Sequence, residues 1–587
     1  MPVHNSEIAD KFDRLADLLE IEDANPFRVR AYRNAARTVR GYPRSMSDLL
    51  DDGEDLTELP DIGDDLAKKI QTMVETGRLP LLEEVEARTP PALSELMKIE
   101  GLGPKRVRAL YLELNIKTLD DLKEAADSGK IHEIAGFGDK SEEKIKQRVA
   151  KFSGEKPRTK LIEAEEIAKP LLEYLKKAEG IKDVMIAGSY RRRKETVGDL
   201  DILITAKGAF SANKKGAFSA NKKGSPIMDH FTGYDEVDEV VSKGKTRSTV
   251  YLRSGMQVDL RVVPQVSYGA AQHYFTGSKA HNIAVRKMGV KKGYKINEYG
   301  VFKGDERIAG ETEKSVYEKV GLPFIEPELR ENRGELEAAR KGKLPKLITL
   351  DDIRGNLHAH TKASDGHNTL AEMAEAAAAL GYEYLAITEH STSLRVASGL
   401  DKKALLEHIK KIDKLNETLD NIVLLKSSEV DILEDGSLDY PDELLKELDF
   451  TVCAVHQKFD LPSKKQTERI LRAMDNRYFN ILAHPSGRLI NERDPYETDL
   501  EKILEEAKAR DCFVELNAQP QRLDLTDEGC MMAKEIGVKI SIATDAHSTS
   551  DLEHMRCGVD QARRGWLEAT DVINCLPLKK LLKLFSR

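Results

Sequence analysis

Apolar residues in the first 150 positions recur at helical spacing, and loops with glycine or proline interrupt them. In the first segment one helical face would carry Phe12, Leu15, Leu18 and Leu19. An apolar residue and a glycine, followed by a helical pattern, occur three times: "LPDIGDDLAKKI" at 59–70, "IEGLGPKRVRAL" at 99–110 and "IAGFGDKSEEKI" at 134–145. The pattern predicts an all-helical region with a loosely repeated turn between helices.

Residues 151–325 mix strands with helices. Short apolar, β-branched runs predict strands in "DVMIAGS", "DLDILI", "STVYLRS" and "MQVDLRVV". We therefore expect an α+β sheet domain there. Residues 326–350 are charged and hold two prolines, which is typical of a linker. From residue 351 onward short strands alternate with helices about eight times, which predicts an α/β barrel-like domain.

Length and charge narrow the class of protein. A chain of 587 residues predicts several domains. Lys and Arg total 92 against 101 Asp and Glu, a net charge of −9, so contacts with nucleic acid must use local basic patches. The five cysteines form no CxxC pair, which favours free thiols in a reducing compartment. Without an apolar run of roughly 18 residues or a signal peptide, we expect a soluble, cytoplasmic protein with no membrane contact.

An octapeptide, KGAFSANK, is repeated in tandem and followed by a lysine at 207–223. With five lysines and no acids, the segment predicts a basic surface loop that arose by local duplication. Contact with the DNA backbone is the alternative interpretation.

In each helical repeat, glycine allows a tight turn at which the next helix begins. The free N–H groups of a helix N-terminus attract anions, so these turns resemble the helix-hairpin-helix element that holds DNA phosphates. The second and third copies supply the expected DNA contacts, namely Gly101, Gly103, Lys105, Gly136 and Gly138. The first copy has aspartates at 61, 64 and 65, which would repel phosphate.

Two aspartates stand one residue apart in "GSYRRRKETVGDLDILI", residues 188–204. Side chains alternate along a strand, so Asp199 and Asp201 share a face about 7 Å apart and repel each other unless a cation lies between them. A third carboxylate, Asp259, stands in "MQVDLRVV". If the two strands are neighbours, the three carboxylates suit two Mg²⁺ or Mn²⁺ ions about 3.5–4 Å apart, the arrangement of in-line phosphoryl transfer. Gly188, Ser189 and the arginines at 191–193 would then meet triphosphate oxygens.

This constellation resembles the nucleotidyltransferase core of family X DNA polymerases, and "YFTGSKAHN" at 274–282 and "YKINEYGVF" at 294–302 extend the match. The resemblance covers roughly residues 1–325. It implies that Ser189 and Arg192 bind the β and γ phosphates. It also implies that Tyr274 and Phe275 close on the sugar of the incoming nucleotide and that Gly277 and Ser278 continue that wall. Asn282 and Arg286 would reach the nascent base pair and the template. In one departure, Arg193 stands where many relatives have glycine, which puts the shape of the phosphate loop in doubt.

The helical region resembles the small domain of the same family. By that resemblance "NPFRVRAYRNAART" at 25–38 forms a 5′-phosphate pocket, with Arg28 and Tyr32 as contacts. Lys69 occupies the position of a lysine that acts as a Schiff-base nucleophile in some relatives. An amine attacks only when neutral, and Asp65, one turn earlier, should raise the pKa of Lys69. Our hypothesis is that lyase activity is weak or absent.

Histidines and acids gather after residue 351 in an order that predicts a metal site. HxH and DxH at strand ends put both side chains on one face, and nitrogen and oxygen ligands without cysteine suit Zn²⁺ or Mn²⁺ and more than one ion. The nine candidate ligands are His358, His360, Asp365, His390, Glu429, His456, His484, Asp545 and His547. At the C-terminal face of a barrel such residues would converge.

This region resembles the polymerase-and-histidinol-phosphatase (PHP) domain over residues 352–587. The resemblance implies a phosphoesterase site with up to three ions and a Mn²⁺-dependent 3′–5′ exonuclease, with abasic-site endonuclease or 3′-phosphatase activity as further expectations. In two departures, Glu389 replaces the usual Asp before His390, and Ser428 replaces a common Gly before Glu429. Neither removes a ligand.

The sequence thus predicts a multidomain DNA repair enzyme that fills short gaps and trims 3′ ends. Its expected partners are gapped or nicked duplex DNA and dNTPs, and we expect a monomer. A polymerase with a structural or DNA-holding PHP domain, and a template-independent nucleotidyltransferase, are the alternatives. The predicted domains are a helical lyase-like domain (1–88), helix-hairpin-helix fingers (89–150), a nucleotidyltransferase palm (151–262), a thumb (263–325), a linker (326–350) and a PHP domain (351–587).

Overall fold

The computed structural model of the chain forms two compact units, Met1–Pro157 and Arg158–Arg587. It describes residues 3, 5–42, 45–97, 99, 102–134, 137–138, 142, 145–146, 149, 158–206, 210–212, 218–220 and 224–585. Each unit is built around its own apolar cores.

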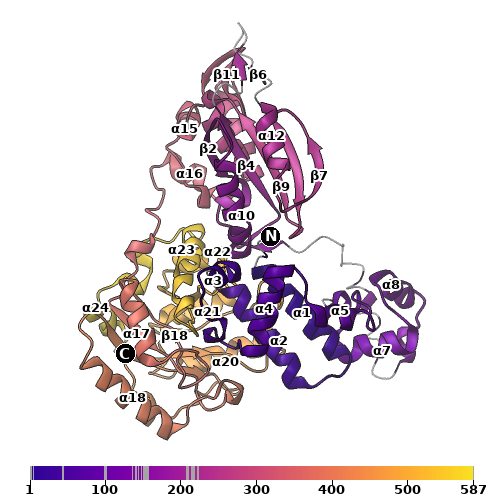
Figure 1. Cartoon of the computed structure of the whole chain (residues 1–587). Coiled ribbons are helices and arrows are strands. Elements are labelled where there is room, and N and C mark those ends of the chain that lie inside the picture. The colour runs from indigo at the N-terminus through magenta and orange to yellow at the C-terminus, as the bar shows by residue number, and fades with distance from the viewer. Residues whose placement is uncertain are drawn as a thin grey trace. The chain divides into compact units, whose positions relative to one another are not determined.

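The first unit is helical throughout its described part (Figure 1). Asn25 begins its second helix by accepting a hydrogen bond from the N–H of Phe27 at 2.9 Å, and Pro26 fits the first helical turn because it lacks an N–H. The face predicted around Phe12 packs onto the next helix, where the rings of Phe12 and Tyr32 lie 5.8 Å apart. The helices are α1 (Asn5–Ile21), α2 (Pro26–Gly41), α3 (Met46–Asp51), α4 (Asp64–Thr76), α5 (Pro80–Glu86), α6 (Leu93–Leu96), α7 (Pro104–Leu114) and α8 (Leu119–Asp127).

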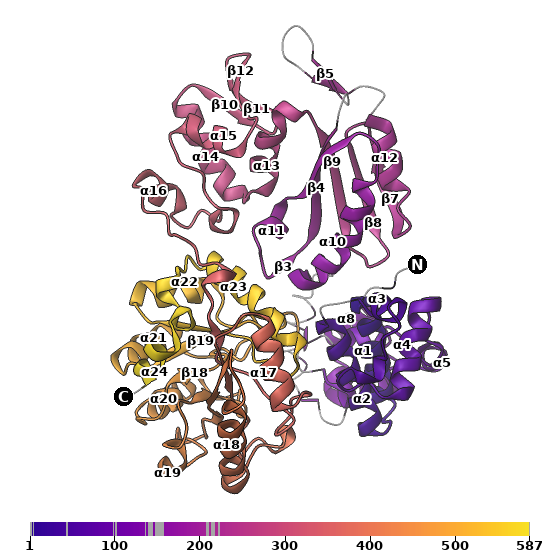
Figure 2. The ribbon, with the colours of Figure 1, turned by 60° about the vertical axis from the view of Figure 1, so that its left-hand side comes forward.

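The second unit begins with a five-stranded sheet in the order β2-β4-β9-β8-β7. Strands β4 and β9 are parallel neighbours, and the other pairs are antiparallel. Figure 2 shows this sheet together with α10 and α12. The elements are β1 (Thr159–Lys160), α10 (Leu161–Lys176), β2 (Ile181–Ile186), α11 (Gly188–Arg191), β3 (Thr196–Val197), β4 (Asp199–Ala206), α12 (Gly224–Thr232), β7 (Val237–Lys243), β8 (Arg247–Leu252) and β9 (Gln257–Val263).

The two faces of this sheet have different roles. Leu200 and Ile202 of β4 pack with Leu260 of β9 into the apolar core that α10 and α12 share. Because side chains alternate along a strand, the aspartates of β4 point to the opposite face. On that face Leu203 packs with Ala271 of the helix that follows the sheet. The hydrophobic pattern therefore directs the acidic residues away from the main core.

A smaller domain follows the sheet and contains a three-stranded antiparallel sheet in the order β10-β11-β12. Residues 326–350, predicted to be a linker, pack against the same core through Leu329, Ala339 and Leu347. Arg330 in this segment is fully buried and bonds Glu313 at 2.6 Å, so these residues are a folded part of the domain. The elements are α13 (Tyr268–Thr276), α14 (Lys279–Lys291), β10 (Tyr294–Asn297), β11 (Gly300–Lys303), β12 (Glu306–Ala309), α15 (Glu313–Val320) and α16 (Glu335–Arg340).

The C-terminal region is a distorted barrel of parallel strands, in which β15 and β16 follow each other along one chain run with only Ser427 and Ser428 between them. Strands β13-β14-β15 form one sheet and β16-β17-β18-β19-β20 another. Two isolated parallel bridges join the sheets, His390 with Glu429 at one seam and Ala359 with Ala546 at the other. The alternation of strands and helices thus predicted the fold class correctly. The strands are β13 (Gly355–Asn356), β14 (Tyr384–Ile387), β15 (Val423–Lys426), β16 (Glu429–Asp431), β17 (Val452–Ala454), β18 (Ile481–Leu482), β19 (Phe513–Asn517) and β20 (Ile540–Ala543).

Helices connect the strands of the barrel. The helix after β13 begins with a capping box, in which the Thr369 side chain accepts the N–H of Glu372 and the Glu372 carboxylate accepts the N–H of Thr369. The helices are α17 (Leu370–Ala379), α18 (Lys402–Asn416), α19 (Asp442–Leu445), α20 (Ser463–Met474), α21 (Leu500–Ala509), α22 (Asp527–Ile536), α23 (Met555–Arg564) and α24 (Leu578–Phe585).

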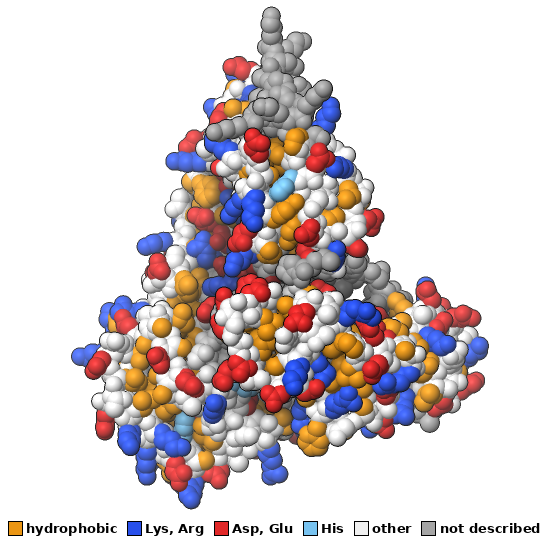
Figure 3. Space-filling view, viewed as in Figure 1, with side chains coloured by type: hydrophobic (Ala, Val, Ile, Leu, Met, Phe, Trp, Pro, Cys, Tyr) orange, Lys and Arg blue, Asp and Glu red, His pale blue; other side chains and the backbone are white. Residues whose placement is uncertain are grey.

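The structure also bears on the predictions for the tandem repeat, the cysteines and membrane-spanning helices. Within the tandem repeat, β5 (Phe210–Ala212) and β6 (Phe218–Ala220) pair antiparallel, and the rest of 207–223 lies outside the described residues. All five cysteines are described, and all are free thiols. Among the described helices, none combines the length and the apolar character that crossing a membrane requires. Acidic and basic side chains are mixed over the face seen in Figure 3.

Candidate active sites

Three carboxylates meet at one edge of the palm sheet. The parallel register of β4 and β9 places Asp201 directly beside Asp259, and Asp199 stands beside Gln257. One carboxylate oxygen from each of the three aspartates lies within 4.8 Å of the others. Asp259 accepts hydrogen bonds from Thr249 Oγ1 at 2.6 Å and Gln257 Nε2 at 2.9 Å. The strand alternation predicted this convergence from sequence.

The electrostatics of these carboxylates fit a divalent cation. Burial, together with the charges of Asp199 and Asp259, raises the pKa of Asp201 to about 7. Burial and the charge of Asp259 also raise the pKa of Asp199. Burial opposes ionisation of Asp259, but its hydrogen bonds outweigh burial and hold its pKa below the usual value. A cation between these groups would favour the ionised form of all three.

The loop after β2 lies directly against this site. Gly188 has φ +63, and a Cβ built on it would stand 2.9 Å from the Asp201 carboxylate. Only glycine allows the backbone to approach so closely in this conformation. The backbone N–H of Ala187 also bonds Asp201 O at 2.7 Å. The loop that carries Ser189 is therefore packed onto a candidate metal ligand.

The three consecutive arginines of this loop contact three different acids. Arg191 bonds Glu313 of α15 at 2.5 and 2.9 Å, and Arg192 bonds Glu331 at 2.9 Å. Arg193 bonds Asp560, on α23, at 2.7 Å. The sequence pattern predicted that all three arginines meet a triphosphate. The structure instead gives all three arginines, Arg192 included, carboxylate partners other than the three aspartates. These acids are distant in sequence and come close only in the folded chain.

Arg192 also joins the loop after β2, residues 187–195, to the turn between α13 and α14. Its Nη1 donates to Thr276 O at 2.6 Å, and Arg191 Nη1 donates to Thr276 Oγ1 at 2.8 Å. The turn continues through Gly277, where a Cβ would come within 3.2 Å of Arg192. Ser278 then caps α14 by accepting the N–H of His281. Gly277 and Ser278 thus lie beside the loop that carries Arg192.

The predicted nucleotide and template contacts form one group on α13 and α14. The rings of Tyr274 and Phe275 lie 5.1 Å apart in an edge-on arrangement. Asn282 Nδ2 donates to Tyr274 O at 2.6 Å, and the Arg286 guanidinium lies 5.9 Å from the Tyr274 ring centroid. Asn282 is buried, and within the described structure its Oδ1 has no hydrogen-bond partner. A buried acceptor of this kind is available to a ligand.

A second group of ligand residues lies at the two barrel seams. Eight of the nine predicted ligands fall into three groups, each with ligand atoms within 4.8 Å of one another. The groups are His360, Asp365, His390 and His547; His358, His360, Glu429 and Asp545; and His390, Glu429 and His456. The ninth, His484, places its Nε2 2.9 Å from Glu429 Oε1. All nine are therefore brought together.

Unsatisfied ring nitrogens in this cluster fit metal ions. Within the described residues, His358 Nε2 and His360 Nε2 are buried without a hydrogen-bond partner, and the neighbouring carboxylate oxygens lie 3.3–3.5 Å away. Buried polar atoms usually have a partner, and an ion would supply it. The surrounding carboxylates overcome burial and raise the pKa of His390 to about 10. The negative charge of the cluster therefore favours a cation.

Two carboxylates behind the ligands were missed by the sequence analysis. Glu515 of β19 accepts from His358 Nδ1 at 2.6 Å, and Asp431 of β16 accepts from His456 Nδ1 at 2.5 Å. Such partners orient an imidazole so that its other nitrogen faces the metal. Asp431 could have been found, because it stands two residues after Glu429 on the same strand face. No local pattern marks Glu515.

Glu389 stands just before the candidate ligand His390 in the chain, but its side chain bonds other residues. It accepts hydrogen bonds from Thr361 N at 3.1 Å and Thr361 Oγ1 at 2.5 Å, and it also bonds Ser364. It therefore supports the loop between His360 and Asp365. Ser428 Oγ donates a hydrogen bond to the backbone carbonyl oxygen of Glu389 at 2.7 Å, which links the start of β16 to the segment after β14.

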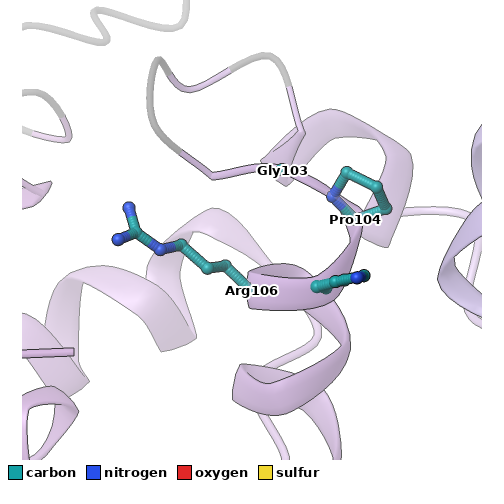
Figure 4. A pocket seen from close by; sticks show the side chains of 4 residues that line it. Gly103, Pro104 and Arg106 are labelled. Atoms are coloured by element: carbon teal, nitrogen blue, oxygen red, sulfur yellow. The ribbon is translucent and has the colours of Figure 1, made fainter. Parts of the chain in front are cut away.

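The best helix-hairpin repeat forms a shallow pocket at the start of α7. Gly103, Pro104, Lys105 and Arg106 line it, and Figure 4 shows Gly103 and Pro104 at the helix start. No side chain caps the N-terminus of α7, so its N–H groups remain open to an anion. Gly138 lies among the described residues, and a Cβ built on it would meet no atom within 4 Å. Gly101 and Gly136 lie outside the described residues.

The first hairpin copy and the predicted 5′-phosphate region lie in the same unit. Asp61 has φ +58, so it adopts the left-handed conformation that glycine usually supplies. Lys69 forms an ion pair with Asp65. Tyr32 is buried, and the Arg28 guanidinium lies 6.0 Å from its ring centroid. The tyrosine thus belongs to the core, and Arg28 lies over it.

Family models match each part of the chain. A polymerase β palm model matches residues 157–239, and a polymerase β thumb model matches 271–331. Helix-hairpin-helix models match 3–79 and 93–151, and a PHP model matches 356–519. The folds described above are therefore those of a polymerase β-type nucleotidyltransferase joined to a PHP domain.

Named relatives agree with these models. The DNA polymerase/3′-5′ exonuclease PolX of Bacillus subtilis is 36% identical over 589 residues, covering 100% of both chains. DNA polymerase lambda of Arabidopsis thaliana is 27% identical and matches 56% of this chain and 62% of its own. A protein named probable phosphatase from Thermoanaerobacter sp. (strain X514) is 32% identical over 33% of this chain and 79% of its own. The chain belongs to the PolX family of DNA polymerases that carry a PHP domain.

Proposed function

We propose that the chain extends DNA primers across short gaps in one active site and shortens 3′ ends in another. The observation that carries the first activity is the register of β4 and β9, which brings Asp199, Asp201 and Asp259 together beside the phosphate loop. The full-length likeness to a protein named DNA polymerase/3′-5′ exonuclease supports both activities. The substrates are then dNTPs and gapped or nicked duplex DNA, bound by a monomer.

In the polymerase site, the three aspartates would hold Mg²⁺ or Mn²⁺, which promotes attack by the primer hydroxyl and neutralises the leaving pyrophosphate. Ser189 and Arg192 lie on the loop that packs against Asp201, where they would bind the triphosphate. Tyr274 would close on the sugar. Asn282, whose Oδ1 is buried without a partner among the described residues, would face the nascent base pair.

In the PHP site, the three ligand groups suit up to three Mn²⁺ or Zn²⁺ ions. Bound ions supply Lewis acidity at a phosphodiester and a nucleophile at neutral pH. Glu515 and Asp431 hold His358 and His456 in the orientation needed for ligation. The buried nitrogens without a hydrogen-bond partner in the described structure support a site filled by metal, which a catalytic and a structural PHP domain would both require.

The remaining contacts would hold DNA. The open N-terminus of α7, with Lys105 beside it, suits a backbone phosphate and carries no sequence preference. Arg28 and Arg286 would contact the downstream and template strands. The ion pair between Lys69 and Asp65 supports the hypothesis of weak lyase activity, because the carboxylate occupies the amine that would have to attack.

A labelled primer in a short gapped duplex tests the two-site proposal directly. The full chain, Asp259→Ala and His358→Ala are compared with Mn²⁺, with and without dNTPs. We expect Asp259→Ala to lose extension alone and His358→Ala to lose shortening alone. Loss of both activities in either variant, with an unchanged melting temperature, would refute two independent sites. If the wild type extends the primer but never shortens it, the exonuclease proposal falls and the polymerase proposal stands.

A further inference from the structure

Arg193 ends the phosphate loop in a backbone conformation that favours glycine. Its φ is +55, in the left-handed region that non-glycine residues rarely adopt. The chain therefore holds a large charged side chain in a conformation that glycine adopts most easily. Contacts made by that side chain must hold the backbone there.

The Arg193 side chain lies in a cluster of four charges between the palm and the PHP domain. Its Nε bonds Asp560 Oδ2 at 2.7 Å, and its Nη1 pairs with Glu165 Oε1 of α10 at 2.7 Å. Arg556, one turn before Asp560 on α23, bonds the other oxygen of Glu165 at 2.5 Å. The side chains of Arg193, Glu165 and Asp560 are each only 20% exposed, so water screens these pairs less than surface pairs.

Two more PHP residues hold the same loop. Arg564 of α23 donates to the carbonyl oxygen of Arg192 at 2.8 Å. Arg488 bonds Glu195, two residues after Arg193, at 2.6 and 3.1 Å. The loop therefore contacts Asp201 through Gly188 at one end and the PHP domain at the other.

We propose that Asp560, a residue of the nuclease domain, is a positioning residue for nucleotide addition. By pairing with Arg193 it holds the left-handed backbone, and thereby keeps Ser189 and Arg192 in place beside Asp201. Asp560 touches neither the aspartates nor the candidate ligands of the PHP site. The inference rests on the proposed triphosphate role of the loop.

The test measures gap-filling kinetics and exonuclease rate on the same full-length preparations. Asp560→Asn keeps the size of the side chain and removes its charge. We expect the KM for dNTP to rise about five-fold, equivalent to about 1 kcal/mol of lost binding, with kcat and the exonuclease rate changed less than about two-fold. Asp475→Asn is the matched control, because Asp475 pairs with Arg510 within the PHP domain at 2.8 Å.

A second substitution separates positioning from general support of the structure. Glycine adopts positive φ without strain, so Arg193→Gly no longer needs the ion pair. We expect the double variant, Arg193→Gly with Asp560→Asn, to return the KM close to the wild-type value. A double variant as poor as Asp560→Asn alone, or a parallel fall in exonuclease activity, would overturn the proposal.

Ser189→Ala distinguishes failure of this inference from failure of the proposed function. A raised dNTP KM in Ser189→Ala, with a normal KM in Asp560→Asn, would overturn the positioning role alone. A normal KM in both variants would also remove the phosphate role of the loop. A raised KM in both, with rescue by Arg193→Gly, would support the proposal.

Discussion

Glu429 is the residue whose replacement should affect the PHP site most. Its Oε1 lies 2.9 Å from His484 Nε2 and 3.2 Å from His456 Nε2. Its Oε2 lies 2.9 Å from His390 Nδ1 and 3.4 Å from His358 Nε2. It belongs to two of the three ligand groups, so one substitution should weaken two metal sites.

Glu429→Gln keeps the volume of the side chain but removes a negative charge and one ligating oxygen. Replacing partners behind a ligand costs 10–100-fold in metal affinity, so loss of a ligand shared by two groups should cost at least about a hundred-fold at each, or about 2.7 kcal/mol. We expect the bound Mn²⁺ to fall from about three ions to about one per chain, with exonuclease activity reduced at least about a hundred-fold.

Elemental analysis after dialysis against Mn²⁺ and a labelled-primer assay check both quantities on one preparation. Primer extension by the same sample should be unchanged, because the ion pairs of Glu429 are with histidines of the candidate PHP metal site and not with the loop that carries Ser189. Glu434→Gln, at an exposed site close in sequence, is the matched control. A Glu429→Gln protein with the full metal content and normal exonuclease activity would refute the assignment of Glu429 as a shared ligand.

Three further predictions concern other parts of the chain. Gly188→Ala should lower the rate of primer extension at least about ten-fold, because the new Cβ would stand 2.9 Å from the Asp201 carboxylate. Slower extension with normal exonuclease activity would confirm this prediction, and extension at the wild-type rate would contradict it. Burial raises the pKa of Cys557 to about 12, so at pH 8 its alkylation in the native protein should be roughly a thousand-fold slower than in the denatured chain, as peptide mass spectrometry can measure; equal rates would show that the thiol is accessible. Asp65→Lys removes the ion-pair partner of Lys69, so the amine is no longer held by a carboxylate and borohydride trapping on an incised abasic site should increase several-fold. Unchanged trapping would contradict the inhibitory role of Asp65.

The aspartate triad could be predicted because its evidence is local. Period-two alternation within "DLDILI" sets the face of Asp199 and Asp201, and a second apolar run supplies Asp259. Most of the nine candidate PHP ligands could be found for the same reason, since they come just after a short strand. Glu429 begins β16 instead, and Asp365 lies in the loop after β13. The all-helical start and the alternating strands and helices after residue 351 likewise follow from hydrophobic period alone.

The contacts of the arginine cluster could not be predicted. Arg191, Arg192 and Arg193 look equivalent in sequence, yet their acidic partners stand 122, 139 and 367 positions away. Nothing near an arginine records which distant carboxylate the fold brings to it. The segment at 326–350 failed for a related reason: its high charge is typical of a linker, but Arg330 is buried because Glu313 compensates its charge.

Several of the candidate metal ligands also lie at the two seams where the sheets of the barrel meet. His390 and Glu429 form the bridge at one seam, while Ala359 and Ala546 form the bridge at the other, each between two candidate ligands. Each bridge joins a single residue pair, and backbone hydrogen bonds cross each seam, among them Ser391 N to Glu429 O at 3.0 Å and His360 N to Ala546 O at 2.8 Å. Ions held by these side chains would therefore act as cross-links between the two sheets. Chelation should then increase amide hydrogen exchange at both seams first, before the strands within either sheet are affected.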